Sequence, residues 1–415
     1  MRGLCFAIVD ECDSVLIDEA RTPLIISNSG KMEQEELTYK KAIRIARKLR
    51  NPRDFTLSVR DKRIELTDFG KAVLRHFTLG MGGVWSGAKR RNELVSQALS
   101  ALHLYLVDKH YLVKDSKVQI IDEYTGRVMA DRSWERGLHQ MIETKENCAI
   151  SGRQETLARI SYQKFFRRYL RLAGMTGTAH EVTRELWSVY RLNVVRIPTN
   201  RPMQRQHISD LVYVSDEMKW EKIIQSIREF HLQQRPILIG TKSVATSEYL
   251  SKLLTEAGLQ HQVLNARQDQ EEAQIIAQAG NAGRITVATN MAGRGTDIRL
   301  APGIAELGGL HVLATERHEA RRIDRQLFGR GGRQGDPGSH QTIVCLEDDF
   351  INDAFGKGLV RLFSDRNKPL PNWLGILIVA MAQASAEHYH SRLRRDLLKQ
   401  DDNLGDMLAF SGRGE

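Results

Sequence analysis

The sequence predicts an α/β protein with two parallel sheets, an α+β insertion in the first sheet and a helical segment after the second. Three observations indicate this class. An apolar run at Leu4–Val9 is followed at once by acidic residues, as at the carboxyl end of a buried strand. Strand and helix patterns alternate cleanly from Asp210 to Leu346. Residues 28–160 lack this alternation and contain two hairpin patterns instead.

The individual elements follow from periodicity and from turn or capping residues. In the alternating part, strands are expected at 237–239, 262–264, 285–288, 310–314 and 341–346, and helices at 243–257, 270–279 and 316–328. Before it, we expect a helix at 156–172 and a short strand at 194–198. In the insertion, helices are expected at 33–49, at 67–76 with Thr67 as the cap, and at 93–106, and hairpins at 57–66 and 111–121.

Composition limits the class of protein and of partner. The chain has 415 residues, enough for two or three domains, and 61 Lys+Arg against 51 Asp+Glu give a net charge of +10. Nucleotides, nucleic acids and acidic lipids are all compatible with that charge. The 4 cysteines form no C-x-x-C pair, which favours a reducing compartment over zinc or a disulfide framework. We expect no signal peptide, because Asp10 and Glu11 follow one short apolar run, and the apolar stretch at 373–382 is too short to span a bilayer.

The stretch from Gln326 to Gly335 contains two arginines, Arg330 and Arg333, on a glycine-rich turn. Guanidinium groups match phosphate oxygens and stay charged, and three residues are nearly one helical turn, so both groups can point the same way. Glycines also let the backbone approach a ligand closely. The stretch predicts a phosphate contact, although a solvated Gly/Arg-rich loop fits the same residues.

Two further stretches suit nucleotide chemistry. Residues 288–297 follow a predicted strand and contain Arg294, Gly295 and Asp297, which suit a phosphate, a close backbone approach and a hydroxyl or water. Asp10 and Glu11, with Asp13 nearby, have the form of a Walker B or DEAD box, in which one acid holds the Mg²⁺ shell and the next orients water. A plain glycine-rich connection and an acidic strand end remain the alternatives for these stretches.

Together these stretches resemble one family, SecA, the ATP-driven motor of bacterial protein export. The similarity covers nearly all of residues 4–405 and is strongest in specific strings. These are Val9–Ser27, Gly174–Ala179, Pro198–Pro202, Asn290–Asp297, Gly308–His311, Thr315–Glu319 and Gln326–Gly338.

The resemblance implies roles for particular residues. Asp10 would hold Mg²⁺ through a water and Glu11 would be the catalytic base, while Arg330 and Arg333 would be motif-VI arginines, one of them an arginine finger. Contacts to ATP from the second sheet and a coupling motif between the sheets are also implied. The former are Arg294, Gly295 and Asp297, and the latter are Thr176, Gly177 and Thr178. Arg322 either supports this network or forms a structural salt bridge.

The resemblance also implies tandem RecA-like sheets of the superfamily-2 helicase type, with the first one incomplete. Residues 1–27 and 161–209 would be a partial first nucleotide-binding domain, 28–160 the preprotein cross-linking domain, 210–350 the second nucleotide-binding domain and 351–415 the start of the helical scaffold. The sequence departs from the family in having Cys12 for an aliphatic residue and Phe328 for an arginine. It also contains no G-x-x-x-x-G-K-[ST] phosphate loop.

The expected function is a SecA-like motor that couples ATP hydrolysis to translocation of unfolded preproteins through a SecYEG-type membrane channel. The expected location is the cytoplasm, peripheral on the inner face of the cell membrane and in contact with anionic lipid. Without a phosphate loop the chain is not expected to hydrolyse ATP alone, and a separate N-terminal chain would supply that loop; a homodimer is also compatible. The alternatives are a non-catalytic preprotein-binding fragment or relic and, less consistent with the long insertion after Ser27, an RNA or DNA helicase.

Overall fold

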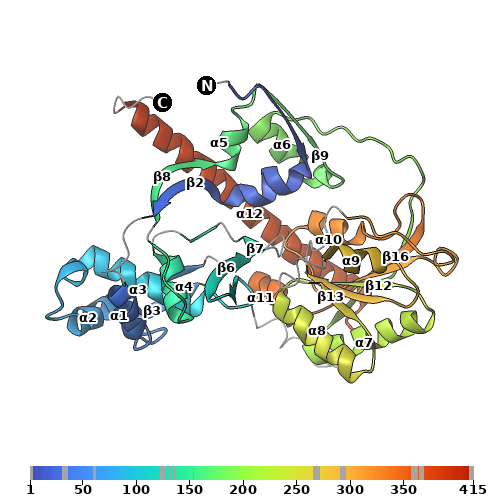
Figure 1. Ribbon diagram of the computed structural model, residues 1–415, viewed down its shortest axis with the longest axis horizontal. Helices are drawn as coiled ribbons and strands as arrows, with labels where there is room; N and C mark the ends of the chain where they lie inside the picture. The colour runs from blue at the N-terminus through green and yellow to red at the C-terminus, as the bar shows by residue number, and fades with distance from the viewer. Residues whose placement is uncertain are drawn as a thin grey trace. The chain divides into compact units, whose positions relative to one another are not determined.

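The computed structural model describes residues 3–29, 36–58, 62–121, 128–129, 132–134, 137–152, 154–264, 272–289, 296–356, 363 and 369–410. The chain divides into two compact units, one made of residues 1–25 and 158–415 and the other of residues 26–157 (Figure 1). Parallel sheets lie in the first unit and antiparallel hairpins in the second, so the predicted α/β class with an α+β insertion is confirmed. The four domain assignments stay predictions.

The alternating part of the chain forms a seven-stranded parallel sheet. Its strands are β10 (Gln204–His207), β11 (Leu211–Tyr213), β12 (Ile237–Thr241), β13 (Gln262–Leu264), β14 (Ile285–Thr289), β15 (Leu310–Ala314) and β16 (Pro337–Cys345). They are ordered β10-β16-β15-β12-β14-β13, and β11 pairs with the second half of β16. The five predicted strands are confirmed, whereas β10 and β11 were not predicted.

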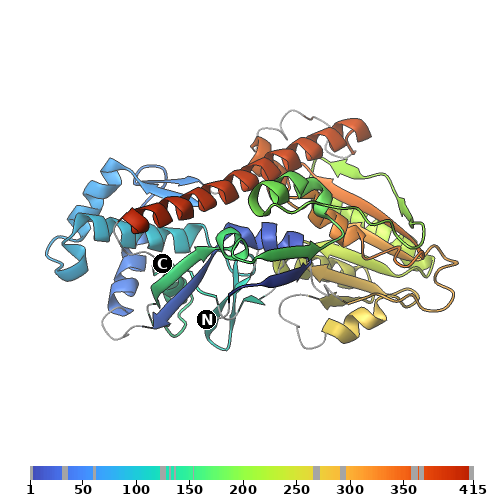
Figure 2. The same ribbon diagram turned by 90° about the horizontal axis from the view of Figure 1, so that it is seen from above.

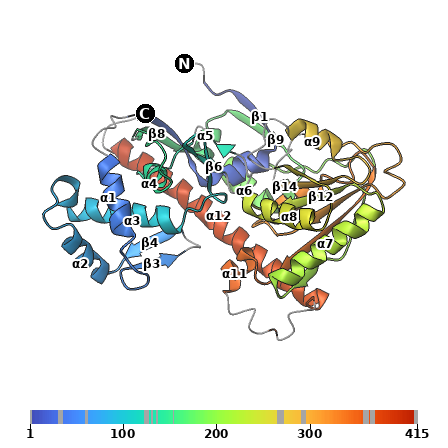
Figure 3. The ribbon, with the colours of Figure 1, turned by 60° about the horizontal axis from the view of Figure 1, so that its bottom comes forward.

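Helices cover both faces of this sheet. They are α7 (Asp216–Leu232), α8 (Val244–Glu256), α9 (Glu272–Gln278) and α10 (Arg321–Phe328). On β12, Ile237 and Ile239 pack in the cluster that contains residues of α7 and α8, and Leu238 packs with α9 and α10. Side chains alternate across a strand, so a strand buried on both faces reads as a continuous apolar run. Figure 3 shows α7 and α8 together on one side of β12 and β14.

The first sheet consists of two parallel strands, β1 (Phe6–Asp10) and β9 (Arg171–Met175), which lie side by side in Figure 2. Phe6 and Ile8 are 59% and 58% exposed, and Met175 is 57% exposed, so apolar side chains of both strands face solvent. The prediction of an incomplete first sheet is therefore confirmed. One cluster that includes Leu16 and Tyr190 packs against these strands. It involves a π-helical turn (Ser14–Asp18), which the 3-10 turn Glu19–Arg21 follows, a second 3-10 turn (Ala179–Val182), α5 (Tyr162–Phe166) and α6 (Thr183–Tyr190); residues 19–21 themselves are not in the cluster.

Three predicted elements near these sheets differ from the structure. The helix expected at 156–172 is strand β8 (Gln154–Ser161), the single-turn helix α5 and strand β9, because the Ser161 hydroxyl caps α5 by accepting from the Lys164 N–H. Residues 194–198 are not a strand, and Val195 and Ile197 are 78% and 84% exposed. The helix expected from 316 begins only at Arg321.

The late start of that helix has a visible cause. The His318 N–H donates to Asp324 Oδ1 at 3.0 Å, so it does not join the backbone hydrogen bonds of a helix. Local side-chain acceptors compete with helical hydrogen bonds in this way. The carboxylate lies inside α10 but organises the loop before it.

The unit of residues 26–157 contains the elements predicted for the insertion. They are α1 (Glu36–Ala46), β3 (Phe55–Ser58), β4 (Arg63–Leu66), α2 (Asp68–Phe77), a 3-10 turn (Gly83–Trp85), α3 (Ala88–His103), β5 (Tyr111–Lys114), β6 (Lys117–Ile121), β7 (Val128–Met129) and α4 (Leu138–Lys145). Both hairpins are antiparallel, and Asp115 and Ser116 have φ of 51° and 58° in the second turn. The predicted cap is confirmed, since Thr67 accepts from the Gly70 N–H at 3.0 Å.

Strand β2 (Pro23–Ser29) leaves the first sheet and pairs with the returning strand β8. After β16 the described residues form two helices, α11 (Asp349–Phe355) and the long α12 (Asn372–Phe410), as predicted for a helical segment. The first half of α12 packs Ile378, Val379 and Ala382 against β11 and the end of β16. None of the described helices is long and apolar enough to cross a membrane.

Candidate functional site

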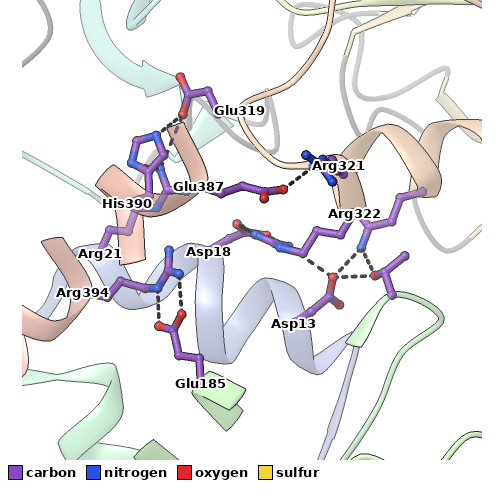
Figure 4. Close-up of polar contacts among 12 residues, drawn as sticks. Asp13, Asp18, Arg21, Glu185, Glu319, Arg321, Arg322, Glu387, His390 and Arg394 are labelled. Carbon is purple, nitrogen blue, oxygen red and sulfur yellow. Dashed lines mark hydrogen bonds and ion pairs between the residues drawn. The ribbon is translucent and has the colours of Figure 1, made fainter. Parts of the chain in front are cut away.

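Asp13, three residues after the end of β1, is the most connected acid of the site. It is fully buried. Its Oδ1 accepts from Thr176 Oγ1 at 2.6 Å. Its Oδ2 accepts from Thr178 Oγ1 at 2.7 Å, from Gln326 Nε2 at 3.0 Å and from an Arg322 guanidinium N–H at 3.2 Å. The carboxylate thus joins the Thr176–Thr178 turn after β9 to helix α10 of the second sheet (Figure 4).

Arg322 supplies a cation beside the buried carboxylate of Asp13. It is 3% exposed and lies on α10 between Asp13 and Asp18, and one N–H donates to Asp18 Oδ2 at 2.5 Å. A second N–H donates to Asp18 Oδ1. Burial by itself would lower the pKa of Arg322, but the two carboxylates outweigh burial and raise it. The sequence left open whether Arg322 supports the motif network or forms a structural salt bridge. Arg322 forms buried salt bridges, and one of them, with Asp13, links it to the Thr176–Thr178 turn.

A second contact joins the same two segments nearer the surface. Arg325 donates to Glu181 at 2.6 Å, and Gln326 Nε2 also donates to Thr178 Oγ1 at 3.3 Å. Arg322, Arg325 and Gln326 recur at intervals of three and four residues, so they lie on one face of α10. That helix runs directly into the turn that contains Arg330 and Arg333.

The arginine turn, which we define as residues 329–335, is held by its own backbone and by Asp297. Gly332, Gln334 and Gly335 have φ of 65°, 56° and 84°, which explains two of the glycines. Arg333 donates to the Gly329 carbonyl at 2.9 Å and to Asp297 Oδ1 at 3.0 Å. The structure therefore brings together Arg333 and Asp297 from two predicted motifs.

Helix α12 contacts residues of the first-sheet region through Arg394 and His390. Arg394 donates to both carboxylate oxygens of Glu185 on α6, at 2.6 and 2.7 Å. His390 accepts at Nδ1 from Arg21 at 2.9 Å, and its Nε2 lies 2.7 Å from Glu319 Oε2. Burial would raise the pKa of Glu319, but His390, Lys242 and Arg21 outweigh it and hold that pKa well below its usual range. In Figure 4 the pairs of His390 and Arg394 lie on one side of Asp18, and Arg322 lies on its other side.

The remaining predicted residues differ in their surroundings. Asp10 is exposed, and its Oδ1 accepts from the Glu11 N–H at 2.9 Å. Glu11 is half-buried with a φ of 49°. Gly177 is exposed, between the two threonines that bind Asp13. Arg330 is half-buried. Arg294 and Gly295 lie outside the described residues. The catalytic and binding roles assigned to all of these residues stay predictions.

Sequence reasoning gave no role to Asp13, Asp18, Gln326 or the Glu185–Arg394 pair. The spacing of Arg322 and Gln326 could have indicated one polar face on α10. Their shared partner, Asp13, lies more than 300 positions earlier in the chain, so the sequence alone does not pair them. A candidate metal group by spacing is Asp216, Cys345 and Asp348. There Lys219 Nζ lies 2.7 Å from Asp216 and 2.6 Å from Asp348, so an ammonium group supplies the positive charge.

Comparisons with known proteins agree with the family resemblance. Residues 1–187 match the model of the SecA DEAD-like domain, and residues 202–304 and 299–367 match that of the SecA P-loop domain. The chain is 52% identical over its whole length to Protein translocase subunit SecA 2 of Nitrosospira multiformis, and it covers 63% of that protein. It is 47% identical, again over its whole length, to SecA 3 of Magnetococcus marinus, of which it covers 64%.

A third relative has the same kind of name. Over 97% of its length the chain is 45% identical to Protein translocase subunit SecA of Lawsonia intracellularis, and it covers 48% of that protein. The chain thus spans between about half and two thirds of the length of the relatives it matches. With two family models and these identities, the chain belongs to the SecA family.

Proposed function

We propose that this chain is part of an ATP-driven motor of protein export. The observation that carries the proposal is the buried carboxylate of Asp13. It links the segment that follows Asp10 and Glu11 to the Thr176–Thr178 turn and, through Arg322 and Gln326, to the helix that leads into the arginine turn. A change at a nucleotide on one sheet would reach the other sheet through this carboxylate.

Asp10 and Glu11 fit the magnesium and base roles better than Asp13 does. Asp10 is exposed, and one of its carboxylate oxygens accepts a hydrogen bond from the Glu11 N–H. The other oxygen can therefore accept from a water of a Mg²⁺ shell. Both oxygens of Asp13 are taken by donors. Bound Mg²⁺ would neutralise charge on the phosphates of ATP, while Glu11 would orient water and one arginine of the turn would stabilise the transferred phosphoryl group.

The partners follow from the same proposal. The unit of residues 26–157 would contact an unfolded preprotein, and the motor would act on a SecYEG-type channel from the inner face of the membrane. The net charge of +10 suits an anionic lipid surface. The three named relatives are translocase subunits, which supports but does not extend these assignments.

The test begins with the chain itself, whose affinity for ATP is measured with and without Mg²⁺. The chain is then substituted for the matched region of the Nitrosospira multiformis relative, and ATP turnover of this chimera is measured. We expect Arg333→Lys or Arg330→Lys to lower turnover by about 10³–10⁵-fold, the usual contribution of an arginine finger. Arg228→Lys, on the exposed side of α7, is the matched control.

Two results would contradict the proposal. One is an inactive chimera whose unsubstituted relative hydrolyses ATP under the same conditions. The other is an active chimera in which neither arginine variant differs from Arg228→Lys. Binding of an unfolded preprotein with no effect of nucleotide would instead support a binding protein without a motor.

A further inference from the structure

Strand β10 lies directly against the arginine turn. It pairs in parallel with the start of β16, with Gln204 opposite Pro337 and His207 opposite His340. Gly332 and Gly335 of the turn fit against it, since a Cβ on Gly332 would lie 2.8 Å from Arg205 Cβ and a Cβ on Gly335 2.9 Å from Arg201 Cδ. The glycines therefore allow close contact with the segment 201–205.

Arg205 of β10 binds the backbone of the turn from outside. One guanidinium N–H group donates to the Phe328 carbonyl at 2.9 Å and to the Gly331 carbonyl at 3.1 Å. Phe328 is the last residue of α10, where a cation is favoured, and its carbonyl also accepts from the Gly331 N–H at 3.2 Å. The two carbonyls flank Gly329 and Arg330, so this contact fixes the peptide of Arg330 on both sides.

The same contact reaches Arg333. Its Nε donates to the Gly329 carbonyl at 2.9 Å, so the Arg333 side chain is folded back on the segment that Arg205 holds. Residues with positive φ at 332, 334 and 335 mean that helical hydrogen bonds do not set the shape of this turn. The contact from Arg205 therefore adds to the turn's own backbone bonds and to Asp297 in keeping both guanidinium groups in one place.

An aromatic stack holds the end of α10 to β10 as well. The Phe328 ring lies 4.4 Å from the His340 ring, and His340 stacks on His207 of β10 at 4.8 Å and 22°. Phe328 is 7% exposed and is the residue that stands where the family resemblance has an arginine. In this chain the packing of Phe328 on His340 attaches the end of α10 to the sheet. The guanidinium group of Arg205 binds the backbone carbonyls of Phe328 and Gly331.

We propose that Arg205 is a positioning residue of the arginine turn, which sets where Arg330 and Arg333 meet phosphate. Arg205 also follows the segment 191–203, which has no helix or strand and connects the first sheet to the second. A displacement of the first sheet is thereby transmitted to the turn through β10. The catalytic part of this inference rests on the proposed function, whereas the structural part does not.

The structural part is tested on the whole chain by amide hydrogen exchange. The N–H groups of Arg330, Gly331 and Asp336 donate within the turn, to Leu327, Phe328 and Arg333. In Arg205→Ala these amides should exchange about ten to a hundred times faster, since two hydrogen bonds from a charged donor are lost. In Arg205→Lys the exchange rates should lie between those of the unsubstituted chain and of Arg205→Ala. In Arg201→Ala, where an exposed side chain with a 3.2 Å bond to Gln334 is removed, the exchange rates should change little.

The catalytic part is tested by ATP turnover of the chimera described above. A positioning role predicts that Arg205→Ala lowers kcat about ten- to a hundredfold with a KM within about threefold, and that Arg205→Lys recovers part of kcat. Unchanged exchange in the turn, or a fall in melting temperature with kcat unaffected, would overturn the inference. If even the unsubstituted chimera lacked activity, the proposed function would fail, while the exchange experiment would still decide the role of Arg205.

Discussion

Replacing Asp13 by Asn should destabilise the unit of residues 1–25 and 158–415 by about 3–5 kcal/mol, the range for removing one partner of a buried ion pair. The size of the side chain is kept, but the charge is lost. An amide has one oxygen, whereas Thr176 donates to one oxygen of Asp13 and Thr178, Gln326 and Arg322 donate to the other. Whichever way the amide turns, its NH₂ group faces at least one donor.

A sum over the bonds gives a similar value. A hydrogen bond to a charged group contributes about 1.5–3 kcal/mol and one between neutral groups about 0.5–1.5 kcal/mol, so each of the two threonine bonds weakens by about 1 kcal/mol. Thr176 can turn its hydroxyl to accept from the NH₂ group, but the bond from Gln326 to the uncharged oxygen also weakens by about 1 kcal/mol, and Arg322 loses one of its two carboxylate partners. Arg322 keeps its pair with Asp18, which limits the loss.

The assay is the free energy of unfolding in urea at pH 7, followed by circular dichroism. Asp10→Asn is the matched control, because the same chemical change is made three residues earlier on an exposed side chain, and it should cost less than about 0.5 kcal/mol. A double-mutant cycle with Thr178→Val should give a coupling of about 0.5–3 kcal/mol. Equal effects of the Asn substitutions at 10 and 13, or no coupling to Thr178, would refute the assigned network.

Three more changes test separate parts of the unit. Arg394→Met should cost about 1–3 kcal/mol in urea unfolding, because the half-buried carboxylate of Glu185 loses both hydrogen bonds from the guanidinium group. Arg395→Met on the exposed side of α12 is the control, and equal losses would contradict the pairing. Burial lowers the pKa of His311 from 6.5 to about 3. The folded state therefore binds fewer protons, and stability falls below about pH 6.5, by about 2 kcal/mol at pH 5. His311→Gln should remove this part of the pH dependence of the free energy of unfolding, and His180→Gln should not. An unchanged pH profile in His311→Gln would contradict the assignment to His311. Gly240→Ala places a Cβ 2.4 Å from Leu327 Cδ2 and should cost about 1–3 kcal/mol, partly recovered by Leu327→Ala; no recovery would show that the contact is not the cause.

Sequence patterns predicted the elements whose burial is set within a short window. β12 is apolar on both faces because helices cover both, and Thr67 caps α2 through atoms three residues apart. Such features need no knowledge of distant residues. The stretches that resemble the SecA family include Asp10, Glu11, Arg330 and Arg333. The resemblance does not give the contacts that these residues make.

Apart from the late start of α10, which has a local cause, the failures share one physical reason: a distant partner decides the local structure. Residues 156–172 contain enough apolar residues for a helix, but Leu170 and Arg171 donate their N–H groups to Leu4 and Cys5, about 166 positions away, so the segment ends as a strand. Asp13 looks like one more acid in an acidic loop, because the four donors that surround it come from two other segments. Arg205 lies in an unpredicted strand for the same reason.

The kind of contact between the two sheets indicates how the unit can move. In the described part of the chain, none of the buried apolar clusters contains residues of both sheets, and the cluster with Leu16 and Tyr190 stays within the first. The contacts that do cross include the ion pairs Asp18–Arg322 and Glu319–Arg21. Separating the sheets would therefore expose little apolar surface, but would leave several charges without partners unless a ligand or water replaced them. Such a connection favours a few discrete arrangements over gradual bending, and an anionic ligand that competes for Arg322 or Arg21 would change which arrangement is populated.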